Sequence, residues 1–364
     1  MNTAANHRHH DAPEIPFQIG KCPIPIIWLD TSIFLNLAML RSGKLNKIQE
    51  NRLKPLRERI HDLTRAGKLL CPRVDQPSEV WIRRSDFLDA LHDLSLGITT
   101  RPRAAIKEAQ IQRLMTAYIA ETRSVTFPYT DAFIDDPVYK LEKARRSSYI
   151  VTVDTPPTKE RIQQARSRRG TIHKEWEELR KTCIAEKTTF EQQLARERAG
   201  GMNADIAAVA AAKTARQKQM RGERLTQNEM WSLLDIGRLI RTWNRLGGKP
   251  KGPKGLLRFL NSPYYQIAPS CDISSILTAK LMVGEKKICP GDAMDVEHIS
   301  SMLPYANLMV VDEAMKRIVQ GLDLDTKYKT TVCYIGDSKE IEDFFEVVEK
   351  STPCHSPFPS VSKG

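Results

Sequence analysis

Two aspartates of this chain directly follow short apolar runs that have the composition of buried strands. Asp30 follows the run over residues 24–29, and Asp312 follows a second apolar run that ends at Val311. The carboxyl ends of parallel strands meet at one edge of an open sheet, and ligands bind at that edge. We therefore expect the two carboxylates to lie close together in an acidic pocket, which suits a hard divalent cation.

Two further carboxylates stand at predicted helix starts. Glu79 follows a Pro-Ser pair, which initiates helices well, and Asp295 begins the helix before the second apolar run. Several carboxylates held together repel one another, and a bound cation relieves that repulsion. A metal ion held by them can lower the pKa of a water molecule and polarise a phosphodiester oxygen. The candidate ligands of Mg²⁺ or Mn²⁺, and the candidate catalytic residues of phosphodiester hydrolysis, are Asp30, Glu79, Asp295 and Asp312.

Two residues near Asp295 are additional candidates, and each has a structural alternative. Asp292 could join or replace Asp295 as a ligand, or it could cap the helix that begins there; the helix cap is the interpretation we favour. His298 falls on the same side of that helix as Asp295 and could contact a phosphate or a base. A hydrogen-bonded structural histidine is the more common role for a residue in such a position.

A basic segment lies between Gly237 and Cys271, where the sequence contains no acidic residue. Its seven cations are Arg238, Arg241, Arg245, Lys249, Lys251, Lys254 and Arg258. Lysine and arginine bind phosphates, and the nearby Phe259, Tyr264 and Tyr265 could stack on unpaired bases. In the alternative interpretation the aromatic rings belong to the core, and only the glycine- and lysine-rich loop is exposed. In both cases we expect RNA binding that weakens steeply with salt.

The elements that must position these residues alternate between strands and helices. Apolar runs predict strands, and apolar residues at helical spacing predict helices. In chain order we expect a strand over 24–30, a helix from Ile33, a helix over 47–66, a strand over 68–72, a helix from Pro77, a helix over 272–283, a helix from Asp295, a strand ending at Val311, a strand over 330–335 and a helix over 340–350. This alternation indicates an α/β fold with a mainly parallel sheet.

Residues 95–235 have a different character, with helical patterns, many alanines and an excess of basic side chains. We expect helices over 104–122, 159–198 and 203–220, with a hairpin that turns at Gly200 and Gly201. These helices could be a solvated scaffold, an arm for self-association or a protein partner, or a surface that contacts RNA. The apolar stripe that follows, over residues 231–246, has helical spacing and is expected in the core.

Composition limits the class of protein. The chain has 364 residues, of which 41% are hydrophobic, enough for a sizeable core. Its net charge of +12 and its isoelectric point near 9.3 indicate polyanionic partners, chiefly nucleic acid, although solvated basic faces would give the same values. The seven cysteines form no Cys-x-x-Cys pair, which is typical of reduced thiols rather than of a zinc site or a disulfide framework. Because no apolar signal core and no run of ~20 apolar residues occurs, we expect a cytoplasmic protein without a membrane segment.

The acidic motifs resemble those of the PIN-domain nucleases. Residues 28–35 are similar to the opening strand of that family, with Asp30 as the first acidic ligand and Ser32 as the small polar residue that follows it. Glu79 matches the second acidic position of the family. Residues 291–312 resemble the segment that carries the third and fourth positions, which here correspond to the two remaining candidate aspartates.

This resemblance covers residues 23–90 and 260–350. It implies a Rossmann-like three-layer sandwich with a mainly parallel central sheet, and an endoribonuclease that cuts single-stranded RNA with Mg²⁺ or Mn²⁺. It also implies that Ser32 steadies a water molecule or the side chain of Asp30. The span from Glu79 to the third position is far longer than in compact family members, so the helical region is expected to be an insertion whose role the resemblance does not define.

The expected organisation is a flexible tail over 1–22, a first PIN-like part over 23–94, a helical insertion over 95–235, a second PIN-like part over 236–352 and a tail over 353–364. The main functional hypothesis is a metal-dependent endonuclease that acts on RNA rather than DNA, in RNA turnover, a toxin system or phage defence. The first alternative is a PIN-like module that binds RNA or protein without cutting. The second is a structural assembly component that uses the insertion to hold a partner.

Overall fold

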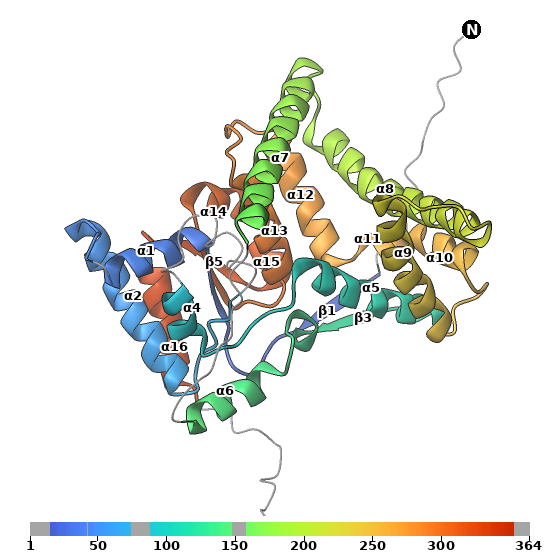
Figure 1. Ribbon diagram of the computed structural model, residues 1–364. Coiled ribbons are helices and arrows are strands. Elements are labelled where there is room, and N and C mark those ends of the chain that lie inside the picture. Colours follow the sequence, from blue (N-terminus) through green and yellow to red (C-terminus); the bar gives the residue numbers. More distant parts are fainter. Residues whose placement is uncertain (1–14, 42, 74–87, 148–157, 353–364) are drawn as a thin grey trace, which may run out of the picture. The chain divides into compact units, whose positions relative to one another are not determined.

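The computed structural model describes residues 15–41, 43–73, 88–147 and 158–352 (Figure 1). The described chain is a mixed α/β structure in which helices predominate and the strands are short. It divides into two compact units, each built from several separate stretches of sequence. The helical unit comprises the described residues within 1–18, 109–127 and 198–272, and the sheet unit comprises those within 19–108, 128–197 and 273–364.

A three-stranded parallel sheet lies in the sheet unit. Its strands, in spatial order, are β2 (Ile27–Leu29), β4 (Leu308–Val311) and β5 (Thr331–Tyr334). In register, Leu29 of β2 pairs with Val310 of β4, which pairs with Cys333 of β5. All residues of β2 and β4 are buried, as expected for short strands that are covered on both faces.

Isolated parallel bridges continue the pairing beyond β2. Ile26 bridges to Leu70, with a hydrogen bond of 2.9 Å from the N–H of Ile27 to the carbonyl oxygen of Leu70. A second parallel bridge joins Arg73 to Thr99. The strand predicted over 68–72 is therefore present only as single bridging residues.

Helices contact the two sets of side chains that alternate along β2. Ile27 and Leu29 belong to a hydrophobic core cluster. That cluster also contains side chains of α1 (Thr31–Arg41), α2 (Lys47–Arg65), α4 (Leu88–Ser95) and α16 (Ser338–Lys350). Trp28 points to the other face, where its ring centroid lies 5.9 Å from that of His298 in α13 (Asp292–Met302).

Short elements complete the sheet unit. They are η2 (Tyr129–Ala132), α6 (Pro137–Arg146), α14 (Glu313–Gln320) and α15 (Leu324–Tyr328). The start of α6 is set by Asp136, whose carboxylate accepts hydrogen bonds from the N–H groups of Val138 and Tyr139 at 2.9 and 3.2 Å. Such a cap satisfies N–H groups that have no partner within the helix.

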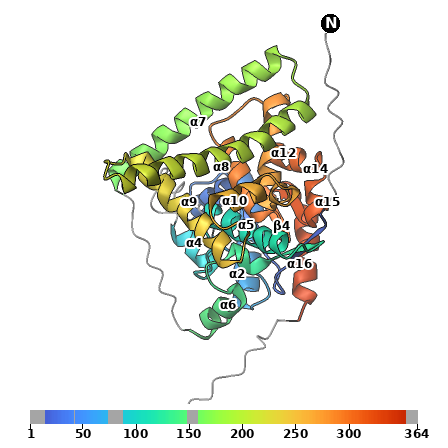
Figure 2. The ribbon, with the colours of Figure 1, turned by 90° about the vertical axis from the view of Figure 1, so that its right-hand side faces the viewer.

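The two longest helices, α7 (Lys159–Ala185) and α8 (Phe190–Met220), are joined by a turn over residues 186–189 (Figure 2). The prediction of a turn at Gly200–Gly201 is wrong, because both glycines lie inside α8. The turn forms instead where Lys187 adopts a φ of 52° and where Thr189 and Gln192 exchange hydrogen bonds at the start of α8. Reciprocal capping of this kind fixes a helix start, whereas an internal glycine only lowers helix stability by about 1 kcal/mol.

The helical unit has an aromatic core. It contains α9 (Gln227–Arg245), α10 (Pro253–Leu260), α11 (Pro263–Gln266), most of α8 and parts of α5 (Arg103–Ile119) and α12 (Pro269–Val283). The ring of Phe259 lies 6.1 Å from that of Trp243 and 5.7 Å from that of Tyr118. Strand β1 (Phe17–Gly20) pairs with β3 (Val125–Pro128), so the range predicted as an N-terminal tail contains a strand.

Several predictions of local structure are confirmed. The helix expected over 47–66 is α2, and the strands expected over 24–30 and 330–335 contain β2 and β5. The expected domain boundaries stay a prediction, and the two compact units divide the chain at other positions. Within the described part of the chain, no helix is both long enough and apolar enough to cross a bilayer.

Candidate functional site

Asp30 and Asp312 lie at the same edge of the sheet, at the carboxyl ends of neighbouring strands. β2 ends at Leu29 and β4 ends at Val311, and the N–H of Asp30 donates to the carbonyl oxygen of Val310 at 2.9 Å. Neighbouring strands are about 4.8 Å apart. The structure therefore brings these two backbone positions together, as the sequence leads us to expect.

The carboxylate of Asp30 is held by the first turn of α1. Its Oδ2 atom accepts hydrogen bonds from the N–H of Ser32 at 3.0 Å and from the hydroxyl of Ser32 at 2.5 Å. Asp30 is 9% exposed, and the described residues offer no hydrogen-bond partner to its Oδ1 atom. Ser32 thus fixes one carboxylate oxygen and leaves the other available to a ligand.

The carboxylate of Asp312 caps the next helix. Its Oδ1 atom accepts a hydrogen bond of 2.8 Å from the N–H of Met315 in α14. Asp312 is exposed, and within the described part of the chain its Oδ2 atom accepts no hydrogen bond. Each of the two aspartates therefore stands at a helix N-terminus, where the helix dipole favours negative charge. Two aspartates that only cap helices would make these same contacts. Metal binding would therefore depend on the second carboxylate oxygen of each aspartate.

A third carboxylate, Asp337, follows the third strand of the sheet. Its Oδ2 atom accepts hydrogen bonds from the N–H of Tyr334 at 2.8 Å and from Nζ of Lys316 at 2.5 Å. Burial is the largest influence and opposes the charge of Lys316, but the hydrogen bond to Asp337 and the negative charges of Asp337, Cys333 and Glu340 together outweigh it and raise the pKa of Lys316. Sequence reasoning missed Asp337, although a carboxylate placed just after the run 330–335 is the same signal that identified the first two.

Asp295 lies in the first turn of α13, close to a cation. A Cβ atom placed on Gly291 would be 3.6 Å from Oδ2 of Asp295 and 3.3 Å from an Nη atom of Arg169. Arg169 belongs to α7 and also donates from Nε to the carbonyl oxygen of Pro290 at 2.8 Å. A guanidinium group that lies near Asp295 competes with a metal ion for its carboxylate.

Asp292 is committed to the loop that precedes α13. Its buried carboxylate accepts a hydrogen bond of 2.8 Å from the N–H of Cys289 and forms an ion pair with Lys286. The helix cap itself is Gly291, so Asp292 closes the loop before the helix rather than serving as the N-cap residue. Both contacts occupy its oxygens, which fits the structural interpretation of this residue.

The described residues contain no group of three or more His, Cys, Asp or Glu side chains arranged to hold a metal ion. Glu79 lies outside the described residues, so one of the four candidate ligands has no place in the structure. The structure joins Asp30 and Asp312 at one sheet edge and places Asp295 at the start of α13. The four-carboxylate site stays a prediction.

His298 is buried beneath the sheet rather than exposed at its edge. It is 4% exposed and lies against Trp28. Among the described residues neither ring nitrogen of His298, nor the indole N–H of Trp28, has a hydrogen-bond partner. A histidine in this position fills the core, and it makes no hydrogen bond of the structural kind expected from the sequence.

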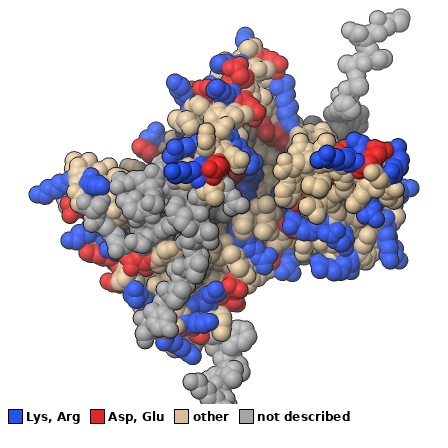
Figure 3. Space-filling view, viewed as in Figure 1, with Lys and Arg blue, Asp and Glu red and all other residues tan. Residues whose placement is uncertain are grey.

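The basic segment has its charges outside and its aromatic rings inside. All seven predicted cations, from Arg238 to Arg258, are exposed, and the surface of this part of the molecule carries many Lys and Arg side chains (Figure 3). Phe259 and Tyr265 are buried, and the hydroxyl of Tyr264 donates to the carbonyl oxygen of Thr122 at 2.8 Å. The core interpretation is therefore confirmed for Phe259 and Tyr265, whereas Tyr264 is partly buried.

The loop after α9 is held against the aromatic core, so the backbone that carries its lysines has a fixed position. The indole N–H of Trp243 donates to the carbonyl oxygen of Pro250 at 3.0 Å. A Cβ atom at Gly248 would lie 2.1 Å from the ring of Trp243, so this position accepts only glycine without rearrangement. The N–H of Gly252 donates to the side chain of Asn244 at 2.7 Å, which ties the far end of the loop to the helix.

In chemical terms, the chain offers two elements that could act on a polyanion. The sheet edge supplies two aspartates with one oxygen each that accepts no hydrogen bond from the described residues, and the helical unit supplies a row of exposed cations. Comparisons of the chain with models of known families, with curated proteins and with solved structures found no match in any of the three.

Proposed function

We propose that this protein is a metal-dependent endonuclease that hydrolyses phosphodiester bonds, with single-stranded RNA as its substrate. One observation carries the proposal: Asp30 and Asp312 follow two hydrogen-bonded parallel strands and lie at one edge of the sheet. That edge is where open α/β sheets bind ligands. Two carboxylates placed side by side repel each other, and a cation between them relieves that repulsion.

The finer fold belongs to the same proposal. We infer a Rossmann-like three-layer sandwich of the PIN type, with a sheet that the bridges at Leu70 and Thr99 extend beyond β2. Ile27 and Leu29 pack with one set of helices, and Trp28 contacts α13 in the opposite direction. Helices on both faces of a parallel sheet are what such a sandwich requires.

The donor set fits Mg²⁺ or Mn²⁺, because both ions prefer carboxylate oxygens. Such an ion would activate a water molecule and polarise the scissile phosphate. The residues of the chain prepare the site for it. Ser32 holds Asp30 in one orientation, and the N–H of Met315 at the start of α14 holds Asp312. In this proposal Asp295 and Glu79 complete the ligand set.

The exposed cations of the basic segment are the proposed contacts for the phosphate backbone. Because they are exposed and the aromatic residues are not, the expected binding is electrostatic and independent of sequence. The net charge of +12 supports a polyanionic substrate.

Cleavage of a fluorescent single-stranded RNA in Mn²⁺ or Mg²⁺ tests the proposal, with a DNA of the same sequence alongside. Asp30→Asn and Asp312→Asn keep the observed hydrogen bonds, since asparagine also accepts from Ser32 and also caps helices. Each variant should lose at least about 100-fold in cleavage rate, which corresponds to about 2.7 kcal/mol in the activation barrier. Asp343→Asn on the exposed face of α16 is the matched control and should cut at the parental rate.

Equal cleavage by the parent and both variants would remove the sheet edge as the catalytic site. Salt-sensitive RNA binding with no cleavage in either metal would favour a binding module, for which one observation speaks: the described residues contain no three-ligand group. Association of the full chain into a defined oligomer, with neither binding nor cleavage, would favour a structural component.

A further inference from the structure

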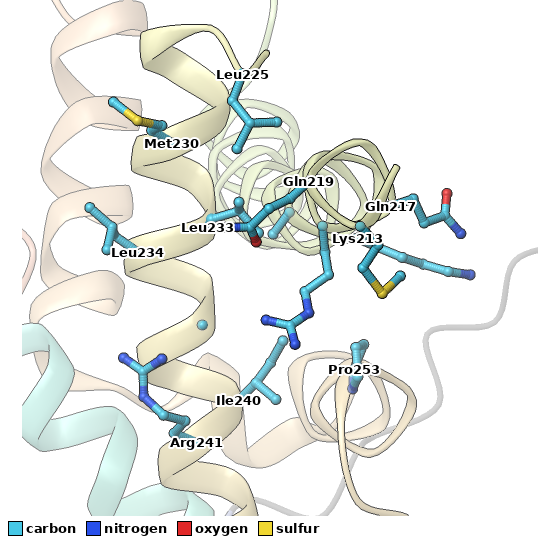
Figure 4. Close-up of a pocket in the computed structure, with 14 residues that line it drawn as sticks. Lys213, Gln217, Gln219, Leu225, Met230, Leu233, Leu234, Ile240, Arg241 and Pro253 are labelled. Carbon is cyan, nitrogen blue, oxygen red and sulfur yellow. The ribbon is translucent and has the colours of Figure 1, made fainter. Parts of the chain in front are cut away.

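A groove lies within the helical unit, between the C-terminal half of α8, the helix α9 and the start of α10 (Figure 4). Its volume is about 820 Å³, which falls within the range of ~300–1,000 Å³ that is usual for binding pockets. In Figure 4, Leu233 and Ile240 extend from α9 on the side of α8 and α10, Lys213 extends from α8, and Pro253 lies at α10. The groove is therefore built by one compact unit alone.

Large apolar side chains stand exposed along this groove. Met220 is 71% exposed, Leu234 is 58% exposed and Met230 is 50% exposed. The sequence predicted that the apolar stripe of α9 lies in the core, which is true of Ile236 and Trp243 but wrong for the side that lines the groove. Contiguous apolar surface of this kind marks an interaction site more often than a free surface. Methionine is common where a surface must adapt to a partner.

A glycine in the middle of α9 opens the groove floor. Gly237 lines the groove and has ordinary helical geometry, because it is absent from the residues with positive φ. A glycine inside a helix lowers its stability by about 1 kcal/mol relative to alanine. A Cβ atom at this position would meet only the flexible tip of Arg241, at 3.3 Å. The fold of the chain therefore does not require glycine at position 237. Close approach of another molecule to the backbone of α9 would require it.

The rim of the groove is cationic. Lys213, Arg216 and Arg241 line it, and none of the lining residues is acidic. Nearby carboxylates are already engaged, since Glu229 pairs with Lys218 and Asp235 lies 3.9 Å from Arg238. The described residues give none of the three rim cations an ion-pair partner. A partner that carries carboxylates would supply the missing charges.

From these observations we propose that the groove binds an acidic amphipathic helix of a partner protein, independently of any nuclease activity. The lining residues of α9 run from Met230 to Arg241, a rise of roughly 16 Å, which equals about three turns of a docked helix. Leucine-like side chains at i, i+4 and i+7 of the partner would enter the groove, and its flanking Glu or Asp residues would face the rim cations. The lining is largely apolar and includes the exposed side chains of Met220, Met230 and Leu234, which suits leucine-like side chains better than the charged backbone of RNA.

A fluorescein-labelled peptide of about 18 residues, with leucines on one face and glutamates on the other, is a suitable probe because helices of that length are near the limit of stability in water. Its binding to the full chain is followed by fluorescence anisotropy, with a scrambled peptide of equal composition for comparison. Leu234→Asp and Arg216→Glu should each weaken binding by at least about 10-fold, and Gly237→Leu should abolish it by filling the floor.

The matched controls lie on α9 but outside the groove. Trp231→Asp changes a residue that is 55% exposed, and Arg238→Glu makes the same charge change as the rim variant, so both should bind as the parent does. Because Leu234, Arg216 and both control residues are exposed, circular dichroism should show unchanged helix content in each variant.

Three results would overturn the proposal. The first is the absence of saturable binding, and the second is equal binding of the scrambled peptide or equal loss in the control variants. The third is displacement of the peptide by oligouridylate or by anionic lipid vesicles, together with loss of that ligand's binding in Leu234→Asp, which would assign the groove to RNA or to a membrane surface instead.

Discussion

Lys21 is a partly buried cation whose removal should change how stability depends on pH. Its Nζ atom donates to the carbonyl oxygen of Ala306 at 2.6 Å and to the hydroxyl of Thr330 at 3.1 Å, and no carboxylate accepts from it in the described structure. Burial, and then the positive charge of Lys329, lower the pKa of Lys21 from 10.5 to about 8. Lys21→Met removes the charge and keeps most of the side-chain volume.

The size and sign of the effect follow from this shift. A pKa difference between 10.5 and about 8 corresponds to about 3 kcal/mol, at about 1.36 kcal/mol for each pH unit. Between these two pH values the unfolded chain binds the proton and the folded chain does not, so the free energy of unfolding rises with pH. Below pH 8 the folded protein carries the full penalty of a buried charge, and above pH 10.5 that penalty is absent.

Urea unfolding of the parent and of Lys21→Met, measured between pH 7 and pH 10.5, would test this. The variant should be the more stable protein at pH 7, because it lacks the penalty of the charge. The carbonyl oxygen of Ala306 is not left without a donor, since it keeps a hydrogen bond of 2.9 Å from the hydroxyl of Thr330. Its advantage should shrink by roughly 2–3 kcal/mol as the pH rises to 10.5. Lys339→Met, at an exposed position, is the control for general effects of alkaline pH. A difference between parent and Lys21→Met that stays constant within about 0.5 kcal/mol would refute the reasoning.

Two further predictions concern the glycines and the lysines of the helical unit. Gly248→Ala places a Cβ atom 2.1 Å from the ring of Trp243, and it should lower the free energy of unfolding by about 1–3 kcal/mol. Gly200→Ala in α8 meets nothing within 4 Å and should raise it by about 0.5–1 kcal/mol. Urea unfolding of both variants measures the two changes, and equal effects would contradict both assignments. Replacing the three lysines of the loop 247–255 by alanine should reduce the salt dependence of RNA binding, measured as log Kd against log salt, by about 2. An unchanged slope would show that this loop does not contact the backbone of the nucleic acid.

The sheet was the most predictable part of the fold. Runs such as 24–29 and 308–311 contain only apolar residues, and such runs form strands that are buried on both faces. The edge position of Asp30 and Asp312 follows from that pattern alone. The turn at Lys187 did not, because a left-handed lysine and a polar cap carry a weaker signal than the glycine pair at 200–201, which the helix simply includes.

The sequence also shows which side chains a helix face carries, but not whether the rest of the chain covers that face. The stripe over 231–246 has the spacing of a buried helix face, yet Leu234 stands in solvent while Trp243 is buried. Amphipathic spacing shows only that a helix has an apolar side. Whether the same molecule or another covers that side depends on tertiary packing. His298 illustrates the converse case, because a polar residue on a predicted site helix proved to be core.

The pairing of β2 with β4 has a consequence for synthesis of the protein. Ile27 cannot pair with Leu308 until Leu308 has been synthesised. At ~5–20 residues per second the ribosome needs roughly 15–55 s to translate the segment between them. Until then the bridge to Leu70 offers the nascent β2 its earliest parallel contact. The strand leaves the ribosome long before the sheet can close, and pairings of such long range form slowly. The yield of folded protein should therefore depend on the rate of elongation and on chaperones that shield the apolar segment around Trp28. A lower growth temperature during expression should raise that yield.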